Sequence, residues 1–346
     1  MLVRKMIRAM LPLLGGVGLL LYPAEAAQAV RDGLVICGTS VVPALFPFFV
    51  LTKFFLGGVQ SHTSGKASEA VMRRCFGLGG ACMRPLLLSF VGGYPIGAAS
   101  VAEQYQNGSI SKNEAERLLV FCNNSGPAFF LGVIGAVVLS DAKAGLVLYA
   151  SHVLGALCCG ALLRENRPRQ AVLRKLRPAQ EAQSGFLQVV SSSCAALLQI
   201  SGLILFFSVV LSLLEASGIF RLLCRLLPGI PAQTLRAMLC GIFELSGGVI
   251  RLRGCDGAAV LCAFLMGWGG LCVHLQAMSF WQPQQLKPRG YFAAKLLHGT
   301  LSTLFAALFL SPKPPLWLLS GAVLLLCVFF PEIRQKMGGN PRRNTV

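Results

Sequence analysis

The stretch from Leu86 to Phe130 reads LLLSFVGGYPIGAASVAEQYQNGSISKNEAERLLVFCNNSGPAFF. It contains two apolar runs, and each is interrupted by residues that a membrane-spanning helix normally avoids. The interruptions are Gly92-Gly93-Tyr94-Pro95 and Asn123-Asn124-Ser125-Gly126-Pro127. A backbone group freed inside hydrocarbon costs several kcal/mol, so such breaks persist only where protein or a wet cavity surrounds them. Because transporters bind polar solutes at broken helices of this kind, the stretch indicates a solute site.

The composition of the whole chain indicates a protein embedded in the lipid bilayer. Its 346 residues are 55% hydrophobic and 13% charged, whereas an average soluble protein has about 25% charged residues. Several apolar runs reach or approach the roughly 20 residues needed to cross a bilayer, among them residues 33–58, 186–215 and 317–330 with their flanks. The net charge of +18 lies in short connecting segments. We therefore interpret it as a determinant of topology and predict no nucleic-acid partner.

Signals for metal, redox or enzymatic chemistry are missing from the sequence. Most of the thirteen cysteines lie within apolar runs and no pair has C-x-x-C spacing, which is typical of buried thiols that pack as small hydrophobes. The chain contains no G-x-x-x-x-G-K-[ST], H-E-x-x-H or G-x-S-x-G motif. We predict no metal, no cofactor and no catalytic residue, and so no enzyme.

Two interpretations of the N-terminus stay open. Basic residues precede an apolar run that ends at Tyr22, which fits either an uncleaved first helix or a signal segment cleaved near Ala26 or Ala29. The next span, residues 33–58, contains Pro43 and Pro47, which predict a kink because proline disrupts the helical hydrogen bonding.

The segment from Pro85 to Ala99 poses a question of topology. As a straight helix it would cover only about 22 Å at 1.5 Å per residue. If it crossed the membrane, the basic residues of 164–177 would lie outside the cell. If it turned back at Gly92 to Pro95, they would lie in the cytoplasm, as the positive-inside rule favours. We expect a re-entrant hairpin, followed by a helix that begins at a Ser111–Glu114 capping box.

The second half of the chain repeats the order of these features. At one constant offset Gly33 aligns with Gly185, Gly77 with Gly229 and Arg84 with Arg236. Beyond the arginines, Gly247-Gly248 corresponds to Gly92-Gly93, residues 267–270 correspond to the break at 123–127, and His298 corresponds to His152. An odd number of crossings in each unit would invert the second copy, which is a common transporter architecture.

The predicted fold is an all-α polytopic membrane protein with about eight transmembrane helices and two re-entrant hairpins in an inverted internal repeat. Its segments are an N-terminal helix and linker (1–32), a first repeat (33–163), a basic cytoplasmic linker (164–184), a second repeat (185–311), and a C-terminal helix with a basic tail (312–346). Both termini lie in the cytoplasm. Five arginines would then lie outside, against the charge rule: Arg221, Arg225, Arg236, Arg251 and Arg253.

Each candidate substrate-binding residue in the first half has a structural alternative. Gly92, Gly93, Tyr94 and Pro95 would let backbone amides face a solute, although Gly93 and Gly97 also form a small-x-x-x-small pair typical of close helix packing. The side chains of Asn123, Asn124 and Ser125 can donate and accept hydrogen bonds together, as a hydroxyl-rich solute requires. They could instead satisfy the amides freed by Pro127.

The candidates in the second half surround the corresponding breaks. Glu244 is an intramembrane carboxylate, and such groups are costly enough to suggest an ion ligand or a proton carrier; an ion pair with Arg236 or Arg251 is the alternative. His274 suits a ligand or proton role or, alternatively, plain packing. The remaining candidates are Ser246, Gly247, Gly269, Gly270 and Gln276.

Three strings place the chain near a known group. SFVGGYPIGA, NGSISKNEAERLLVFCNN and GWGGLCVHLQ resemble the sporulation integral membrane proteins of the YlbJ type. That group resembles, in turn, a larger set of bacterial membrane proteins with nucleoside recognition (Gate) domains. The resemblance implies a bacterial cytoplasmic (inner) membrane protein that is connected with spore cortex formation and moves a small polar solute, for which a nucleoside-like molecule is one candidate.

The main hypothesis is therefore a secondary transporter or permease whose solute binds between the two hairpins. Without an ATP site, transport would be coupled to an ion or run downhill. A non-transporting scaffold for cortex-assembly proteins and an intramembrane enzyme acting on a lipid-linked substrate are the alternatives. The solute, the coupling ion and a homo-oligomeric state stay open.

Overall fold

The computed structural model describes residues 15–57, 65–164 and 185–310, and within these ranges the chain is helical with no strand. Four of the described helices are long and apolar enough to cross a bilayer, or up to six if each strongly bent pair counts as one span. The predicted last span lies in 311–346 and much of the first in 1–14, outside the described residues. A count of about eight crossings therefore stays a prediction.

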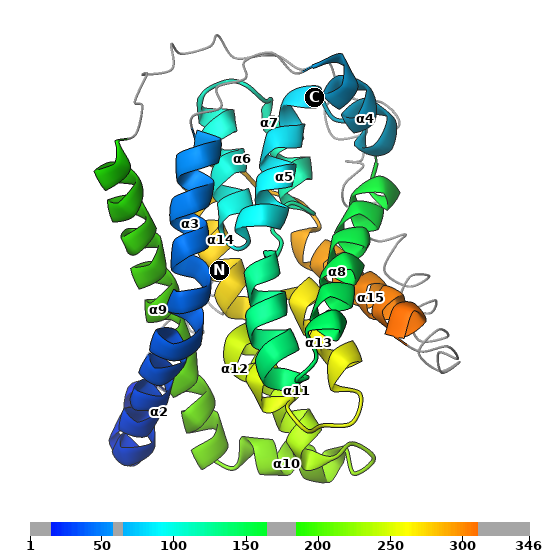
Figure 1. Ribbon diagram of the computed structural model, residues 1–346. Helices are drawn as coiled ribbons and strands as arrows, with labels where there is room; N and C mark the ends of the chain where they lie inside the picture. Colours follow the sequence, from blue (N-terminus) through cyan, green and yellow to red (C-terminus); the bar gives the residue numbers. More distant parts are fainter. Residues whose placement is uncertain (1–14, 58–64, 165–184, 311–346) are drawn as a thin grey trace, which may run out of the picture.

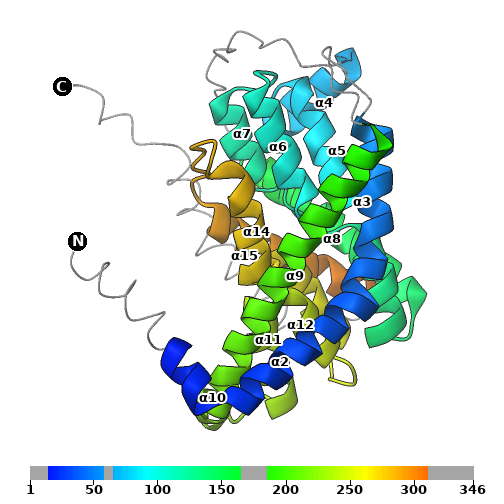
Figure 2. The same ribbon diagram turned by 90° about the vertical axis from the view of Figure 1, so that its left-hand side faces the viewer.

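The first long element is bent where the prolines predict a kink. It consists of α2 (Pro23–Ile36), a π-helical segment η1 (Cys37–Val41) and α3 (Val42–Gly57). Its two arms meet at 54° around Pro43. The element begins at Pro23 rather than at Gly33, because proline suits the first turn of a helix, where its missing N–H is not needed. It packs along α9 (Phe186–Ala216), which runs most of the length of the molecule (Figures 1 and 2).

Two helices form the first hairpin. They are α5 (Met83–Gly92) and α6 (Ile96–Gln106), which pack against each other around the break at Gly93 to Pro95. Oε1 of Glu114, which follows α6, accepts a 3.0 Å hydrogen bond from the amide of Gly79, which precedes α5. The chain therefore returns to the end of the molecule from which α5 started.

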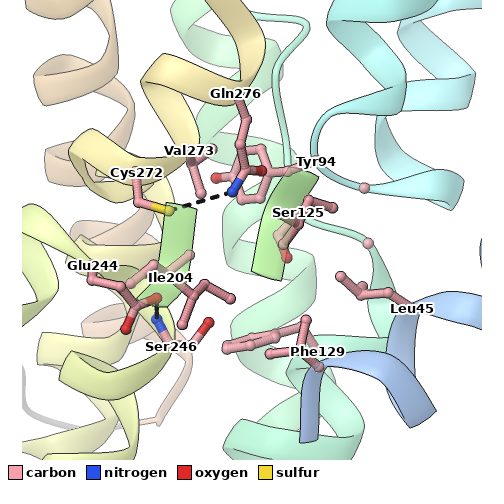
Figure 3. A pocket seen from close by; sticks show the side chains of 15 residues that line it. Leu45, Tyr94, Ser125, Phe129, Ile204, Glu244, Ser246, Cys272, Val273 and Gln276 are labelled. Atoms are coloured by element: carbon pink, nitrogen blue, oxygen red, sulfur yellow. Dashed lines mark hydrogen bonds between the residues drawn. The ribbon is translucent and has the colours of Figure 1, made fainter. Parts of the chain in front are cut away.

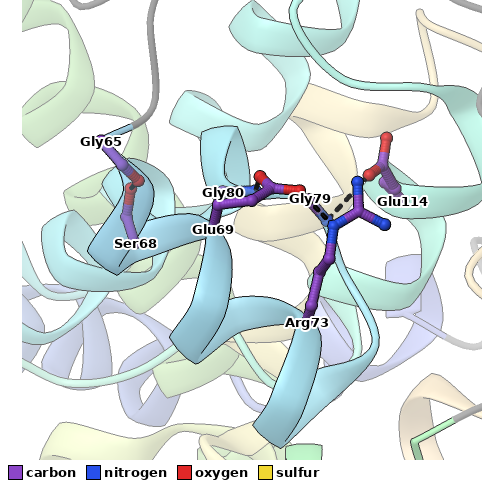
Figure 4. Close-up of polar contacts among 7 residues, drawn as sticks. All are labelled: Gly65, Ser68, Glu69, Arg73, Gly79, Gly80 and Glu114. Carbon is purple, nitrogen blue, oxygen red and sulfur yellow. Dashed lines mark hydrogen bonds and ion pairs between the residues drawn. The ribbon is translucent and has the colours of Figure 1, made fainter.

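The same end of the molecule carries α4 (Lys66–Phe76) and α7 (Lys112–Leu119). Glu69, which pairs with Arg73 within α4, accepts a 2.5 Å hydrogen bond from the amide of Gly80, next to the Gly79–Glu114 contact (Figure 4). The predicted capping box of Ser111 and Glu114 is confirmed at the start of α7. Of these contacts, the bond between Gly79 and Glu114 joins the two ends of the first hairpin.

The second hairpin lies at the opposite end of the molecule (Figures 1 and 2). It consists of α11 (Ala232–Phe243) and α12 (Leu245–Arg251) and follows the short helix α10 (Ile219–Leu226). The predicted break at Gly247-Gly248 is wrong, because both glycines lie within α12 and the chain turns at Glu244. Gly248 packs against the backbone of Gly241, where a Cβ would clash; this close approach requires glycine at position 248 inside the helix.

Two further elements are interrupted. After α7 the chain is non-helical over residues 122–126 and continues as the π-helical segment η3 (Phe129–Val138) and then α8 (Ala142–Leu162). In the second half, α13 (Ala258–Trp268) and α14 (Gly270–Trp281) are separated by Gly269, which has a φ of +95°, and α15 (Tyr291–Leu310) follows. The predicted breaks at 123–127 and 267–270 are thus confirmed.

Candidate functional site

Each hairpin tip packs against the break in the interrupted helix of its own half. Gly93 has a φ of +74°, and a Cβ there would lie 2.7 Å from the amide nitrogen of Gly126. At the other tip, a Cβ on Gly270 would lie 3.0 Å from the carbonyl oxygen of Gly241 and 3.1 Å from the amide nitrogen of Leu245. Glycine is required at these contacts because the backbones approach each other without room for a side chain.

A small cavity of about 50 Å³ lies where the two tips and the two breaks meet. Its polar lining comes from Tyr94 and Ser125 in the first half and from Glu244, Ser246 and Gln276 in the second (Figure 3). Its apolar lining includes Leu45 of α3, Phe129 of η3 and Ile204 of α9. A volume of this size is large enough for water, since a cavity needs about 10–15 Å³ to hold one molecule.

The cavity joins predicted residues from every break. The tips contribute Gly93, Tyr94, Glu244 and Ser246, and the interrupted helices contribute Ser125 and Gln276. Of the remaining predicted residues, those that do not line it are Gly92, Pro95, Asn123, Asn124, Gly247, Gly269, Gly270 and His274. Of these, Gly270 lies next to the cavity through its backbone contacts with Gly241 and Leu245.

Glu244 caps α12 in the wall of the cavity. Its Oε1 accepts a 2.8 Å hydrogen bond from the amide of Ser246, and its Oε2 accepts one of 2.5 Å from the amide of Gly247. A carboxylate is favourable here because a helix N-terminus carries free N–H groups and a partial positive charge. The suggested ion pair is not made: Arg236 pairs with Glu215 at 3.0 Å, and Arg251 donates to the carbonyl of Gly247.

Asn123 and Asn124 make their contacts within the protein. The Nδ2 of Asn123 donates to the hydroxyl of Tyr291 at 3.0 Å, and that of Asn124 donates to Ser89 Oγ at 3.0 Å and to the carbonyl of Phe121 at 2.9 Å. Both side chains are fully buried, and their Oδ1 atoms have no hydrogen-bond partner in the described part of the chain. Within the described residues neither side chain accepts from a backbone amide, as the alternative interpretation requires. The two Nδ2 groups instead tie the break to Tyr291 and Ser89.

His274 joins the same polar network from the second break. Its Nδ1 lies 3.0 Å from the hydroxyl of Tyr291, and its ring packs edge-on against Trp268 and Phe292. Because that hydroxyl accepts from Asn123, it is free to donate its own hydrogen to His274. The network thus links α14 to the break that precedes η3.

Sequence reasoning missed Lys295, which is fully buried in α15. Its Nζ donates a 2.8 Å hydrogen bond to the carbonyl of Asn123, lies 3.1 Å from Nδ1 of His298 and sits 5.8 Å from the centroid of the Tyr94 ring. The available signal was the lysine itself, because a cation inside an apolar run of membrane-spanning length suggests a function.

His152 and His298, which occupy matching positions in the two halves, lie next to each other. Their ring centroids lie 4.5 Å apart, and Nε2 of His298 lies 2.9 Å from the carbonyl of His152. Nε2 of His152 in turn accepts a 3.1 Å hydrogen bond from the amide of Ser125, a cavity residue. Polar contacts therefore connect His274 to the cavity residue Ser125 without interruption. The path runs through Tyr291, Asn123, Lys295, His298 and His152.

The fold and the site define a helical, multi-pass integral membrane protein in which broken helices surround a polar cavity. A comparison with known proteins agrees. The chain is 28% identical over 327 residues to the "Sporulation integral membrane protein YlbJ" of Bacillus subtilis (strain 168), which covers 86% of this chain and 80% of that protein. The resemblance to the YlbJ group is thus confirmed. No family model matches the chain, and no solved structure matches it.

Proposed function

We propose that this protein is a secondary transporter or permease for a small polar solute, which binds in the cavity between the two hairpin tips. The observation that carries the proposal is the convergence of both tips and both helix breaks on one polar cavity. A break inside a membrane needs a surrounding of protein or water, and solute sites in transporters are built from such breaks.

The order of elements supports an inverted repeat. In the first half the bent element α2–α3 is followed by α4, the hairpin α5–α6, the interrupted span α7–η3 and α8. In the second half α9 is followed by α10, the hairpin α11–α12, the interrupted span α13–α14 and α15. The hairpins at opposite ends would then enter the membrane from opposite sides, with both termini in the cytoplasm and about eight crossings.

The cavity size supports a closed state of an alternating-access cycle. Sites for drug-sized ligands are typically about 300–1,000 Å³, whereas this cavity is about 50 Å³. A nucleoside-like solute would enter only after one hairpin tip moves away from the opposite half. Such opening of one element against another is the usual form of transport motion.

The relative's name supports a role in sporulating cells. By analogy with that sporulation integral membrane protein, we place the chain in the bacterial cytoplasmic membrane and link it to spore cortex formation. The transported solute would then be one that the developing spore requires.

A blocking variant tests transport. Ser125→Leu would fill the cavity, while Gly202→Leu in α9 is the control, because a Cβ at Gly202 meets nothing within 4 Å. Untargeted mass spectrometry would compare metabolites inside and outside cells that produce each variant at equal membrane levels. The proposal predicts that the distribution of one solute between the inside and the outside differs between cells lacking the protein and cells overproducing it. Ser125→Leu should abolish this difference, and Gly202→Leu should retain it. Normal sporulation with Ser125→Leu and no shifted solute would favour the scaffold.

A further inference from the structure

Lys295 is a cation buried without an acidic partner. None of its side chain is exposed, and no carboxylate in the described residues forms an ion pair with it. A buried ammonium is costly unless other groups compensate for its lost hydration. The compensation comes from the carbonyl of Asn123, the ring nitrogen of His298 and the face of Tyr94.

This ammonium is bound by the kind of ligand that a coupling ion uses in broken-helix transporters. In such proteins the carbonyls freed by helix unwinding coordinate Na⁺. The Asn123 carbonyl lies in an unwound stretch, two residues before the cavity residue Ser125. The aromatic face of Tyr94, another cavity residue, also attracts cations. A cation supplied by α15 therefore occupies the carbonyl that an external ion would use.

We propose that Lys295 is the resident cation of the transport site, and that a proton carried by Lys295 and His298, rather than Na⁺, couples solute movement. This inference rests on the proposed transport function. It assigns the coupling ion, which the motifs of the sequence leave open.

The hydrogen bonds define one route for the proton. A carbonyl oxygen only accepts hydrogen bonds, so Nε2 of His298 carries the hydrogen that points to the carbonyl of His152. Its Nδ1 then has a free electron pair facing Nζ of Lys295, 3.1 Å away. Transfer breaks one N–H bond of the ammonium and forms one on Nδ1, which leaves a neutral amine and an imidazolium. The total charge is unchanged until the proton leaves for the open side.

Other titratable groups surround this pair and take part in any pH response. From α15 and α8 they are Tyr291, His152 and Cys159; from the break, the first hairpin and α14 they are Cys122, Tyr94 and His274. The experiment therefore compares variants that change the lysine alone.

Thermal unfolding of the purified full chain in lipid nanodiscs tests the inference, with Na⁺, K⁺ or choline chloride at equal ionic strength and pH from about 5.5 to 9. For the wild type we expect a melting temperature that varies with pH and is the same in Na⁺ and K⁺. Lys295→Met removes the ammonium and frees the carbonyl. The melting temperature of this variant should lose the part of its pH dependence that the lysine causes. With Na⁺ at ten times its dissociation constant, the melting temperature should also rise by about 2–4 °C relative to K⁺.

Two further variants keep the test decisive. Lys143→Met, at an exposed lysine in the first turn of α8, should behave as the wild type. Lys295→Arg, which stays charged throughout this pH range, should lose the lysine-dependent response without gaining a Na⁺ response. If the Lys295 variants do not fold, the salt response of the wild type still decides.

Either of two results would overturn the inference. One is a wild type that is stabilised by Na⁺ over K⁺, and the other is a Lys295→Met variant that titrates as the wild type does. Both would leave transport through the cavity intact, because they concern only the coupling ion. A different measurement tests the proposed transport function, which would be refuted if the cavity never opened to both sides of the membrane.

Discussion

The hydroxyl of Tyr94 donates a 2.7 Å hydrogen bond to the carbonyl of Met266 and so joins the first hairpin tip to the end of α13. The two residues belong to opposite halves of the chain, and Tyr94 also lines the cavity. In the proposed cycle this bond holds the cavity closed, because a tip cannot move away while the bond is made.

Tyr94→Phe should weaken the closed state. The substitution leaves the buried carbonyl of Met266 without its partner, which costs about 1–3 kcal/mol. We expect a lower midpoint of thermal unfolding and faster labelling of a cavity cysteine. Tyr105→Phe is the control, because its hydroxyl makes no hydrogen bond within the described residues. Equal stability of both variants would show that the Tyr94–Met266 bond contributes nothing.

Gly93→Ala should disrupt the contact between the first tip and the break. The residue has a φ of +74°, and the new Cβ would lie 2.7 Å from the nitrogen of Gly126; a strained conformation of this kind alone costs about 1–3 kcal/mol. Gly132→Ala in η3 meets nothing within 4 Å and should be neutral or stabilising. Chemical denaturation of both variants in detergent checks this, and a Gly93→Ala protein as stable as Gly132→Ala would contradict it.

Glu244→Ala should destabilise the second tip. It removes both hydrogen bonds to the first amides of α12, and the loss of an N-cap costs about 0.5–2 kcal/mol. The control Glu215→Ala removes an ion pair with Arg236 whose side chains are 42% and 49% exposed, for which about 0–1 kcal/mol is expected. Unfolding at low and high salt separates the two, because only the exposed pair should respond to salt. A salt-dependent effect at Glu244 would argue against the cap.

The membrane topology can be tested at three loops. Arg164 donates to the carbonyl of Arg74 at 2.6 Å, and Glu114 contacts Gly79, so these segments lie at one end of the molecule. In a version without native cysteines, cysteines at Asn107 and Arg164 should react with an impermeant maleimide from the same side. A cysteine at Asp256, next to the second hairpin, should react from the other side. Labelling of Asn107 and Arg164 from opposite sides would make the first hairpin an ordinary crossing.

Much of this arrangement was predictable because local backbone chemistry determines it. Pro95 and Pro127 cannot continue a helix, Gly269 adopts a positive φ, and the Ser111–Glu114 pair is a local capping signal. Such features act through neighbouring residues, so a single sequence displays them.

Contacts between distant segments explain what the sequence did not predict. Gly247 and Gly248 resembled a break but lie inside α12, where the close packing of Gly248 on Gly241 requires a residue without a Cβ. The asparagines at 123 and 124 suggested solute contacts, yet their partners include Tyr291, far along the chain. Lys295 acquires its meaning only beside the carbonyl of Asn123. Periodicity and spacing carry no information on such pairs.

The central claim is that the cavity between the two hairpin tips opens alternately to the two sides of the membrane. The most direct test is a single cysteine at Ser125, in a version without native cysteines, probed with an impermeant maleimide in right-side-out and inside-out vesicles. Ser193→Cys, at a serine buried in α9 and bonded to the carbonyl of Val189, is the control. Alternating access predicts that the Ser125 cysteine is labelled from both sides and the Ser193 cysteine from neither. Labelling at Ser125 from one side only, or from neither, would contradict it.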